Sequence, residues 1–120
     1  NDLVQYTLAA DRNNSALSDY YIAHHPAVLK LMMLTLQAGN KYEKPVSICG
    51  EMASQPQYVP LLIGMGFKEL SVGTSAFLRC KKIIRHCDKE LFNLIENTDL
   101  EHLDSIENLI FEQLKPYYKF

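Results

Sequence analysis

Three short stretches of the chain carry residues that could bring chemistry to the end of a strand. The apolar run from Val46 to Ile48 predicts a strand, and Cys49 follows it directly. In parallel α/β proteins, ligands bind at the carboxyl ends of the strands, and a glycine there lets the backbone approach a ligand closely. Spacing alone leaves Cys49 either a reactive thiol or a buried structural one. The three stretches are Asn1-Asp2, Cys49-Gly50-Glu51 and Gly73-Thr74-Ser75.

The three cysteines of the chain are Cys49, Cys80 and Cys87. An odd number without a short paired spacing argues against a disulfide framework and favours a reducing compartment. Cys80 and Cys87 are seven residues apart, about two helical turns, and no neighbouring residues complete a zinc site. We therefore expect three free thiols and a cytoplasmic protein.

Length and composition indicate one domain of ordinary globular type. The chain has 120 residues, of which 48% are hydrophobic and 22% charged. A net charge of −2 gives no reason to expect nucleic acid or an anionic membrane as a partner. No apolar run approaches the roughly 20 residues of a membrane-spanning helix. Because the sequence begins with Asn1 rather than methionine, we expect it to be a piece of a longer chain.

The middle of the chain shows alternating strand and helix patterns. Apolar residues at helical spacing predict a helix that begins at Pro26 and ends at Gly39 and Asn40. Further patterns predict strands over 46–49 and 69–72, and helices over 58–65 and 75–86. Residues 11–19 and 51–57 are expected to be loops. Strands that alternate with helices at this spacing imply a parallel sheet.

Two amphipathic helices are predicted beyond Asp88, which can cap the first of them. Thr98 with Glu101 predicts a capping box for the second. We therefore expect residues 1–87 to form a partial domain and residues 88–120 to form a helical extension. Two parallel strands are not stable alone, because such sheets need both faces covered. The chain either borrows strands from another copy or holds the last units of a (β/α)8 barrel, which takes about 250 residues.

Four segments together resemble the C-terminal part of the phosphoenolpyruvate-protein phosphotransferases, namely enzyme I of the bacterial sugar phosphotransferase system and its nitrogen-related paralogue. The resemblance covers about residues 1–87. It implies an α/β fold in which this chain is the C-terminal part of a (β/α)8 TIM barrel with extra C-terminal helices. The segments are NDLVQYTLAADR at 1–12, CGEMA at 49–53, LLIGMGFKELSV at 61–72 and KKIIR at 81–85.

The resemblance also implies an activity with its cofactor and partners. The family binds phosphoenolpyruvate and Mg²⁺ at the strand carboxyl ends and releases pyruvate. A histidine on a separate N-terminal domain takes the phosphoryl group and passes it to a small histidine-containing phosphocarrier protein. Further arginines and a second acidic metal ligand come from earlier strands of the family barrel. We therefore expect the isolated chain to be inactive.

Position by position, the resemblance assigns four site residues. Asn1 matches a substrate-contacting asparagine, Asp2 a carboxylate ligand of Mg²⁺, and Arg12 an arginine that holds the phosphate. Cys49 matches the cysteine that protonates the methylene carbon of the departing enolpyruvate. These residue types suit their roles, since arginine pairs with phosphate in a fork and Mg²⁺ prefers carboxylate and phosphate oxygens. A free thiol has a reference pKa of about 8.5 and so carries a proton at neutral pH. Without the resemblance, Arg12 would be read as an exposed loop arginine.

Two other interpretations stay open. One is a non-catalytic self-association module built on the helices over 88–120; the other is a fragment of a pyruvate phosphate dikinase or phosphoenolpyruvate synthase. An unpaired parallel strand invites association, so a homodimer is expected.

Ser54 and Gln55 stand where relatives often carry a glycine-aspartate pair, which leaves the local loop shape open. His24 and His25 are expected at a solvated helix entrance rather than in a phosphohistidine or metal site.

Overall fold

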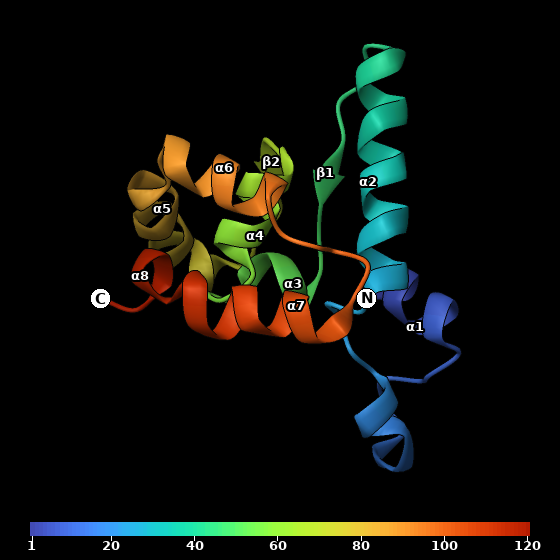
Figure 1. Ribbon diagram of the computed structural model, residues 1–120. Coiled ribbons are helices and arrows are strands. Elements are labelled where there is room, and N and C mark those ends of the chain that lie inside the picture. The colour runs from blue at the N-terminus through green and yellow to red at the C-terminus, as the bar shows by residue number, and fades with distance from the viewer.

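The computed structural model describes residues 1–120 and shows a mixed α/β fold that is mostly helical (Figure 1). Its single sheet has two short parallel strands. In chain order the elements are α1 (Asp2–Leu8), the 3₁₀ helix η1 (Ser15–Tyr20), α2 (Pro26–Lys41), β1 (Ser47–Ile48), α3 (Glu51–Ser54), α4 (Val59–Met65), β2 (Glu69–Leu70), η2 (Thr74–Ala76), α5 (Phe77–His86), α6 (Lys89–Glu96), α7 (Leu103–Asn108), η3 (Leu109–Gln113) and α8 (Lys115–Tyr118).

The two strands form the strand–helix–strand unit that the sequence predicts. Ile48 of β1 lies opposite Leu70 of β2 in parallel register. The backbone N–H of Ser71 donates to the carbonyl of Ile48 at 2.7 Å. The chain between the strands passes through α3 and α4, so that β1 and β2 end at the same edge. The predicted parallel pairing is confirmed, and the sheet does not close into a barrel.

Helix α2 is the longest element and lies beside β1 (Figure 1). It begins at Pro26, whose missing N–H costs nothing at the first helical position, and ends at Lys41. The imidazole Nδ1 of His25 caps it by accepting from the N–H of Ala27 at 3.1 Å. A Cβ atom on Gly39 would lie 2.3 Å from the Val46 side chain, so only glycine lets α2 approach the chain entering β1 this closely.

Two segments that were expected to be loops contain short helices. Within 11–19, η1 begins after Asn14, whose side chain accepts from the N–H of Ala16 at 3.0 Å. Within 51–57, α3 spans Glu51–Ser54 and begins after Gly50. Both helices have six residues or fewer, which is too short for an apolar period to be visible in the sequence.

One of the two predicted helix caps is confirmed and the other is wrong. The Asp88 carboxylate accepts from the N–H of Leu91 at 3.1 Å and caps α6. The capping box of Thr98 and Glu101 does not form, because α7 begins only at Leu103. The Thr98 hydroxyl instead donates back to the Leu94 carbonyl at 2.7 Å at the end of α6.

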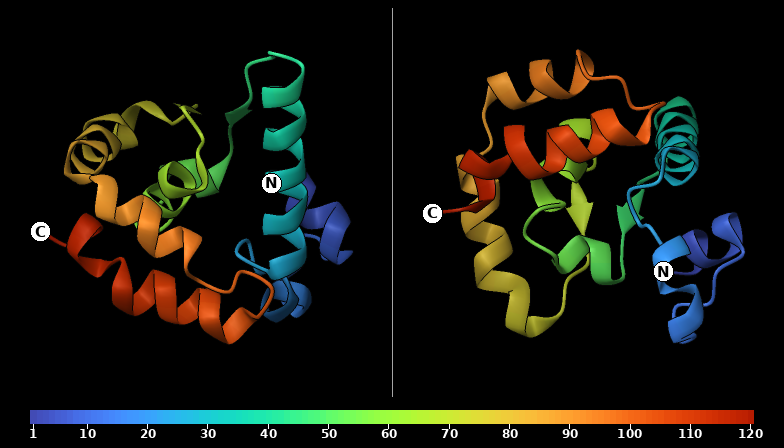
Figure 2. Two further views of the ribbon diagram at one scale, coloured as in Figure 1. Left: turned by 45° about the horizontal axis from the view of Figure 1, so that its top comes forward. Right: turned by 60° about the horizontal axis from the view of Figure 1, so that its bottom comes forward.

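A continuous hydrophobic core joins the strand–helix units to the C-terminal helices. In Figure 2, α4 lies near the centre, with α6 and α7 beside it. A Cβ atom on Gly64 of α4 would lie 2.4 Å from the side chain of Ile95 of α6, so these helices are in close contact. The expected boundary between a partial domain over 1–87 and a helical extension over 88–120 stays a prediction. The main cluster of buried side chains comprises Val4, Val28, Leu29, Met32, Leu36, Met52, Tyr58, Leu61, Leu62, Met65, Phe67, Leu91, Ile95, Ile106, Leu109, Ile110 and Leu114.

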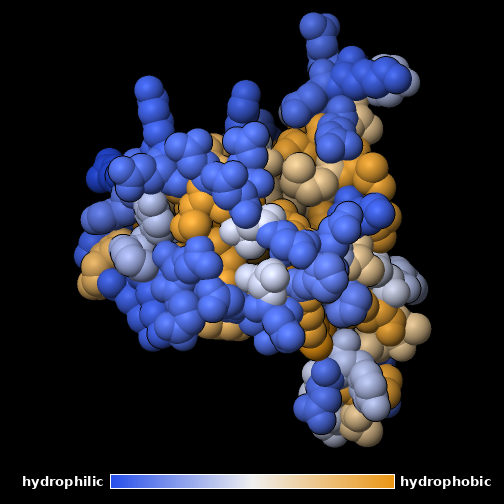
Figure 3. Space-filling model, in the orientation of Figure 1, coloured by the Kyte–Doolittle hydropathy of each residue, from blue (hydrophilic) through white to orange (hydrophobic).

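Apolar side chains also remain on the surface. Figure 3 shows apolar surface along α2 and close to α1, whereas the left of the same view is largely polar. Leu3 and Tyr6 on α1 are exposed, as are Leu31 and Leu34 on α2. None of the helices combines the length and the apolar character needed to cross a membrane.

Candidate functional site

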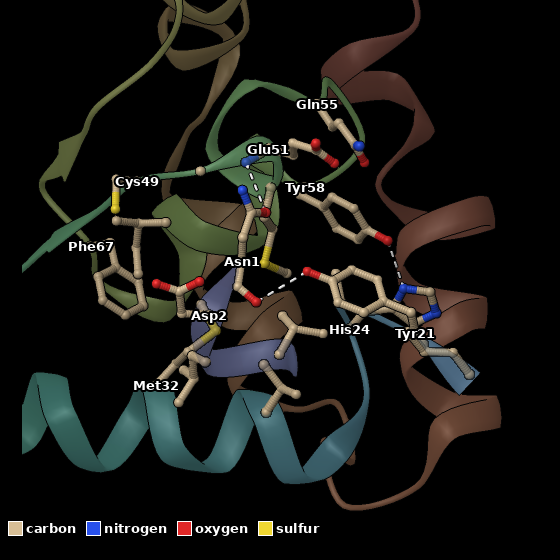
Figure 4. A pocket seen from close by; sticks show the side chains of 18 of the residues that line it. Asn1, Asp2, Tyr21, His24, Met32, Cys49, Glu51, Gln55, Tyr58 and Phe67 are labelled. Carbon is tan, nitrogen blue, oxygen red and sulfur yellow. Dashed lines mark hydrogen bonds between the residues drawn. The ribbon is translucent and has the colours of Figure 1, made fainter. Parts of the chain in front are cut away.

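A cavity of about 680 Å³ lies at the carboxyl end of β1 (Figure 4). The four residues singled out in the sequence, Asn1, Asp2, Arg12 and Cys49, all line it. The walls come from α1 and the loop after it, the chain that enters α2, α2 itself, the chain from Val46 to Tyr58, and two further residues, Phe67 and Glu107. In the view of Figure 4, Cys49 and His24 lie toward opposite sides of the cavity, with Asn1 between them.

Asn1 is held against the loop that follows β1. Its side-chain oxygen accepts from the N–H of Glu51 at 3.4 Å, and its backbone carbonyl accepts from the Tyr21 hydroxyl at 3.1 Å. Gly50 has φ +89° and ψ −172°, a backbone conformation that is essentially restricted to glycine. A Cβ atom there would also lie 3.2 Å from the Asn1 side chain. The glycine therefore brings the loop close to Asn1.

Tyr21 is a cavity residue that the sequence analysis missed. It lines the cavity together with the charged residues Arg12, Glu51 and Asp2. Burial raises the pKa of Tyr21; the positive charge of Arg12 opposes this increase, and the carboxylates of Glu51 and Asp2 add to it. The guanidinium and these two carboxylates thus line the same cavity as this phenol. The only sequence signal was an aromatic residue within a polar stretch.

The chain offers partial coordination for a divalent cation. Asp2 is exposed in the first turn of α1, and its carboxylate and that of Glu51 both line the cavity. No group of three or more histidine, cysteine or acidic side chains is arranged to hold a metal ion. Mg²⁺ is usually bound by one or two carboxylates together with substrate phosphates and water. The residues present fit this pattern.

The three cysteines are free, as predicted, and lie in different environments. Cys49 is exposed at the end of β1. Cys80 is buried, its thiol donates to the Ala53 carbonyl at 3.7 Å, and burial raises its pKa. Burial and the neighbouring Asp88 carboxylate raise the pKa of Cys87 to about 11. Cys49 is therefore the one thiol that combines exposure with a position in the cavity.

The third stretch from the sequence analysis lies beside the cavity rather than in it. Gly73 belongs to a neighbouring hollow, which it shares with Asn1 and Gly50. The N–H of Gly73 donates to the hydroxyl of Ser54 at 3.4 Å. Ser54 therefore connects the loop after β1 to the loop after β2. Ser54, which with Gln55 stands where relatives often carry a glycine-aspartate pair, thus makes its contact with Gly73.

The expectation that His24 is solvated is wrong. Its exposed fraction is 8%, and both ring nitrogens have partners. Nδ1 lies 2.7 Å from the Tyr58 hydroxyl, and Nε2 lies 3.2 Å from a carboxylate oxygen of Glu107. All three side chains line the cavity. No local pattern predicts this contact, because the partners lie 34 and 83 residues from His24 in the chain.

A parallel strand–helix–strand unit with a cavity at the carboxyl end of a strand is the arrangement in which α/β proteins bind ligands. The family profile described as "PEP-utilising enzyme, PEP-binding domain" matches residues 1–89. The chain belongs to this family. The resemblance inferred from the motifs is thereby confirmed.

Several named relatives are similar over most of the chain. A phosphoenolpyruvate-protein phosphotransferase of Cupriavidus necator is 40% identical over 107 residues, which are 89% of this chain and 18% of the relative. One of Enterococcus faecalis is 34% identical over 119 residues, which are 99% of this chain and 20% of the relative. A Salmonella typhimurium protein named phosphoenolpyruvate-dependent phosphotransferase system is 39% identical over 101 residues, 84% of this chain and 14% of the relative. The chain thus spans a fifth or less of the length of these relatives.

Proposed function

We propose that this chain is part of the phosphoenolpyruvate-binding domain of a phosphoenolpyruvate-protein phosphotransferase. The observation that carries the proposal is that Asn1, Asp2 and Arg12, from the two ends of the 1–12 segment, and Cys49, from the end of β1, line one cavity. The names of the relatives favour a phosphotransferase over a dikinase or a synthase. In the longer enzyme, β1 and β2 with their helices would be the C-terminal part of a (β/α)8 barrel.

Binding in this proposal depends on charge pairing. Arg12 holds the phosphate by paired N–H donors, a stronger contact than a single point charge makes. Asn1 hydrogen-bonds the substrate through its carboxamide, and Asp2 is the carboxylate that holds Mg²⁺. The metal ion would neutralise phosphate charge and orient the substrate. Glu51, the second carboxylate of the cavity, is given no catalytic role.

Cys49 completes the chemistry as a proton donor. The phosphoryl group leaves the enol oxygen as the P–O bond breaks, and a bond forms to a histidine nitrogen on an N-terminal domain of the parent enzyme. The remaining enolate of pyruvate takes a proton at its methylene carbon from the Cys49 thiol, so that a C–H bond forms and the S–H bond breaks. The thiolate then regains a proton from solvent. The histidine passes its phosphoryl group to a histidine-containing phosphocarrier protein in the cytoplasm.

Binding without turnover is the expected behaviour of the 120-residue chain alone. With Mg²⁺ present, titration with phosphoenolpyruvate should shift the amide NMR signals of residues 2–12 and 49–51. Arg12→Ala should weaken this binding about 10-fold or more, because a hydrogen bond to a charged group contributes about 1.5–3 kcal/mol. Arg85→Ala is the matched control, since Arg85 is exposed on α5 outside the cavity.

Two results would count against the proposed site, and a third would count only against the expected inactivity. An undiminished affinity in Arg12→Ala, or signal shifts confined to another part of the chain, would remove the site. Release of pyruvate when the chain is mixed with phosphoenolpyruvate, Mg²⁺ and carrier protein would show that the site needs no further residues, and the expected inactivity would be wrong.

A second candidate function is self-association without catalysis, through α1 and α2 rather than through the helices over 88–120 that the sequence suggested. The observation that favours it is the set of exposed apolar side chains on α1 and α2, which include Leu3, Tyr6, Leu31 and Leu34. We propose a homodimer in which these side chains are covered. One chain has a mass of 13.7 kDa, and light scattering across a range of protein concentrations should then give twice that mass. A strict monomer at every concentration would exclude this role for the chain.

A further inference from the structure

One cavity residue comes from the C-terminal helices. Glu107, in α7, is the only residue beyond Phe67 that lines the cavity. It also lies outside residues 1–89, which the family profile matches. The site assigned from the family therefore contains no contribution from this part of the chain, whereas the structure brings one side chain of it to the cavity wall.

Glu107 lies beside His24 at the cavity wall, and for a neutral imidazole the chemistry of the three groups sets the direction of their hydrogen bonds. An ionised carboxylate only accepts, so the Nε2 atom of His24 carries the proton donated to Glu107 at 3.2 Å. In the neutral imidazole Nδ1 is then an acceptor. The Tyr58 hydroxyl, 2.7 Å away, must donate to it. The proton of Tyr58 is thus engaged by His24, the contact drawn as a dashed line in Figure 4.

Packing holds this hydrogen-bonded chain in place. The His24 ring packs against the ring of Phe111 in η3 in a T-shaped arrangement, at a centroid distance of 5.7 Å and an interplanar angle of 81°. Tyr58 is buried, with 6% of its surface exposed. Burial, with a further contribution from Glu107, raises the pKa of Tyr58 to about 12, so its hydroxyl keeps its proton at ordinary pH. No buried side-chain oxygen or nitrogen lacks a hydrogen-bond partner.

We propose that His24 is a positioning residue that makes the C-terminal helices part of the binding cavity. Glu107 holds the proton of the imidazole on Nε2, and Nδ1 of the imidazole engages the proton of the Tyr58 hydroxyl. The Tyr58 hydroxyl then offers no proton to an anionic ligand, whose donors come from Arg12 and Asn1 instead. When Glu107 is removed, nothing fixes the imidazole proton on Nε2, and it can move to Nδ1. Nδ1 then no longer accepts from Tyr58, and the Tyr58 hydroxyl can donate its proton to a ligand.

The first test needs no ligand. At about pH 8, where an ordinary histidine is neutral, long-range ¹H–¹⁵N spectra of the chain should show His24 protonated on Nε2 and bare on Nδ1. Glu107→Ala should bring the two nitrogen shifts together, as expected for mixed tautomers. Asp99→Ala is the matched control, because it removes a carboxylate from the exposed His102 pair. An unchanged His24 spectrum in Glu107→Ala would overturn the proposal.

The second test rests on the proposed function, because its probe is phosphoenolpyruvate with Mg²⁺. Glu107→Ala should change the dissociation constant at least about twofold, the lower end of coupling within one hydrogen-bond network. The same change in a Tyr58→Phe background should have no effect, because the hydroxyl is gone. Equal effects in both backgrounds would overturn the coupling. If the chain binds no phosphoenolpyruvate, the proposed function fails, and the spectra without ligand still decide the role of His24.

Discussion

Cys49→Ala is expected to slow pyruvate formation about 100- to 10,000-fold in the full-length phosphotransferase to which we assign this chain. This is the usual contribution of a positioned general acid. Cys49 is exposed and lines the cavity, and alanine removes its proton while leaving the backbone of the strand end unchanged. Substrate affinity should stay within a few-fold, because Arg12, Asn1 and Asp2 remain.

Single-turnover measurements separate the two quantities. The rate of pyruvate release should fall while the dissociation constant of phosphoenolpyruvate is retained, and phosphorylation of the acceptor histidine should slow less than pyruvate release. Cys87→Ala is the matched control, because Cys87 is a free cysteine that does not line the cavity. Normal pyruvate release in Cys49→Ala would remove the proton-donor role, whatever happens to binding.

Leu109→Ala is expected to lower the free energy of unfolding by about 2–5 kcal/mol, the range for truncating a large buried side chain. Leu109 is fully buried at the start of η3 and belongs to the same core cluster as Val4 and Leu61. Small domains are stable by only about 5–15 kcal/mol, so this loss is a large part of the total. Because the core is continuous, the whole chain should still unfold in one transition.

Denaturant unfolding followed by far-ultraviolet circular dichroism measures this effect. Leu78→Ala is the control, since Leu78 on α5 is 77% exposed and should cost little. Two separate transitions, with Leu109→Ala affecting only one of them, would show that residues 88–120 fold as an independent extension. That outcome would favour the boundary inferred from the sequence over a shared core.

Local features of the chain could be predicted from the sequence because neighbouring residues decide them. Helix α2 follows from Pro26 and an apolar period that extends over four turns, and the cap of α6 follows from Asp88. Prediction failed where two local bonding choices compete. The Thr98 hydroxyl could cap a following helix or bond back to the preceding turn, and in the structure it bonds back to Leu94.

In the candidate site, too, the residues in local motifs could be predicted and the contacts between distant residues could not. The motifs identified Asn1, Asp2, Arg12 and Cys49, and these residues line one cavity. The wall formed by His24 and Glu107 could not be predicted, because 83 residues separate these partners and neither stands in a recognisable motif. Closure of a barrel likewise depends on more strands than β1 and β2, so this chain alone cannot display it.

The geometry at Gly50 limits how this cavity can evolve. Any other residue there would strain the backbone at φ +89° and would also press on Asn1, so two defects would arise from one mutation. A compensating change would have to repair both defects at once, which single substitutions rarely do. Sequence drift is therefore expected to alter the walls of the cavity, such as those around His24, well before it changes the loop between Cys49 and Glu51.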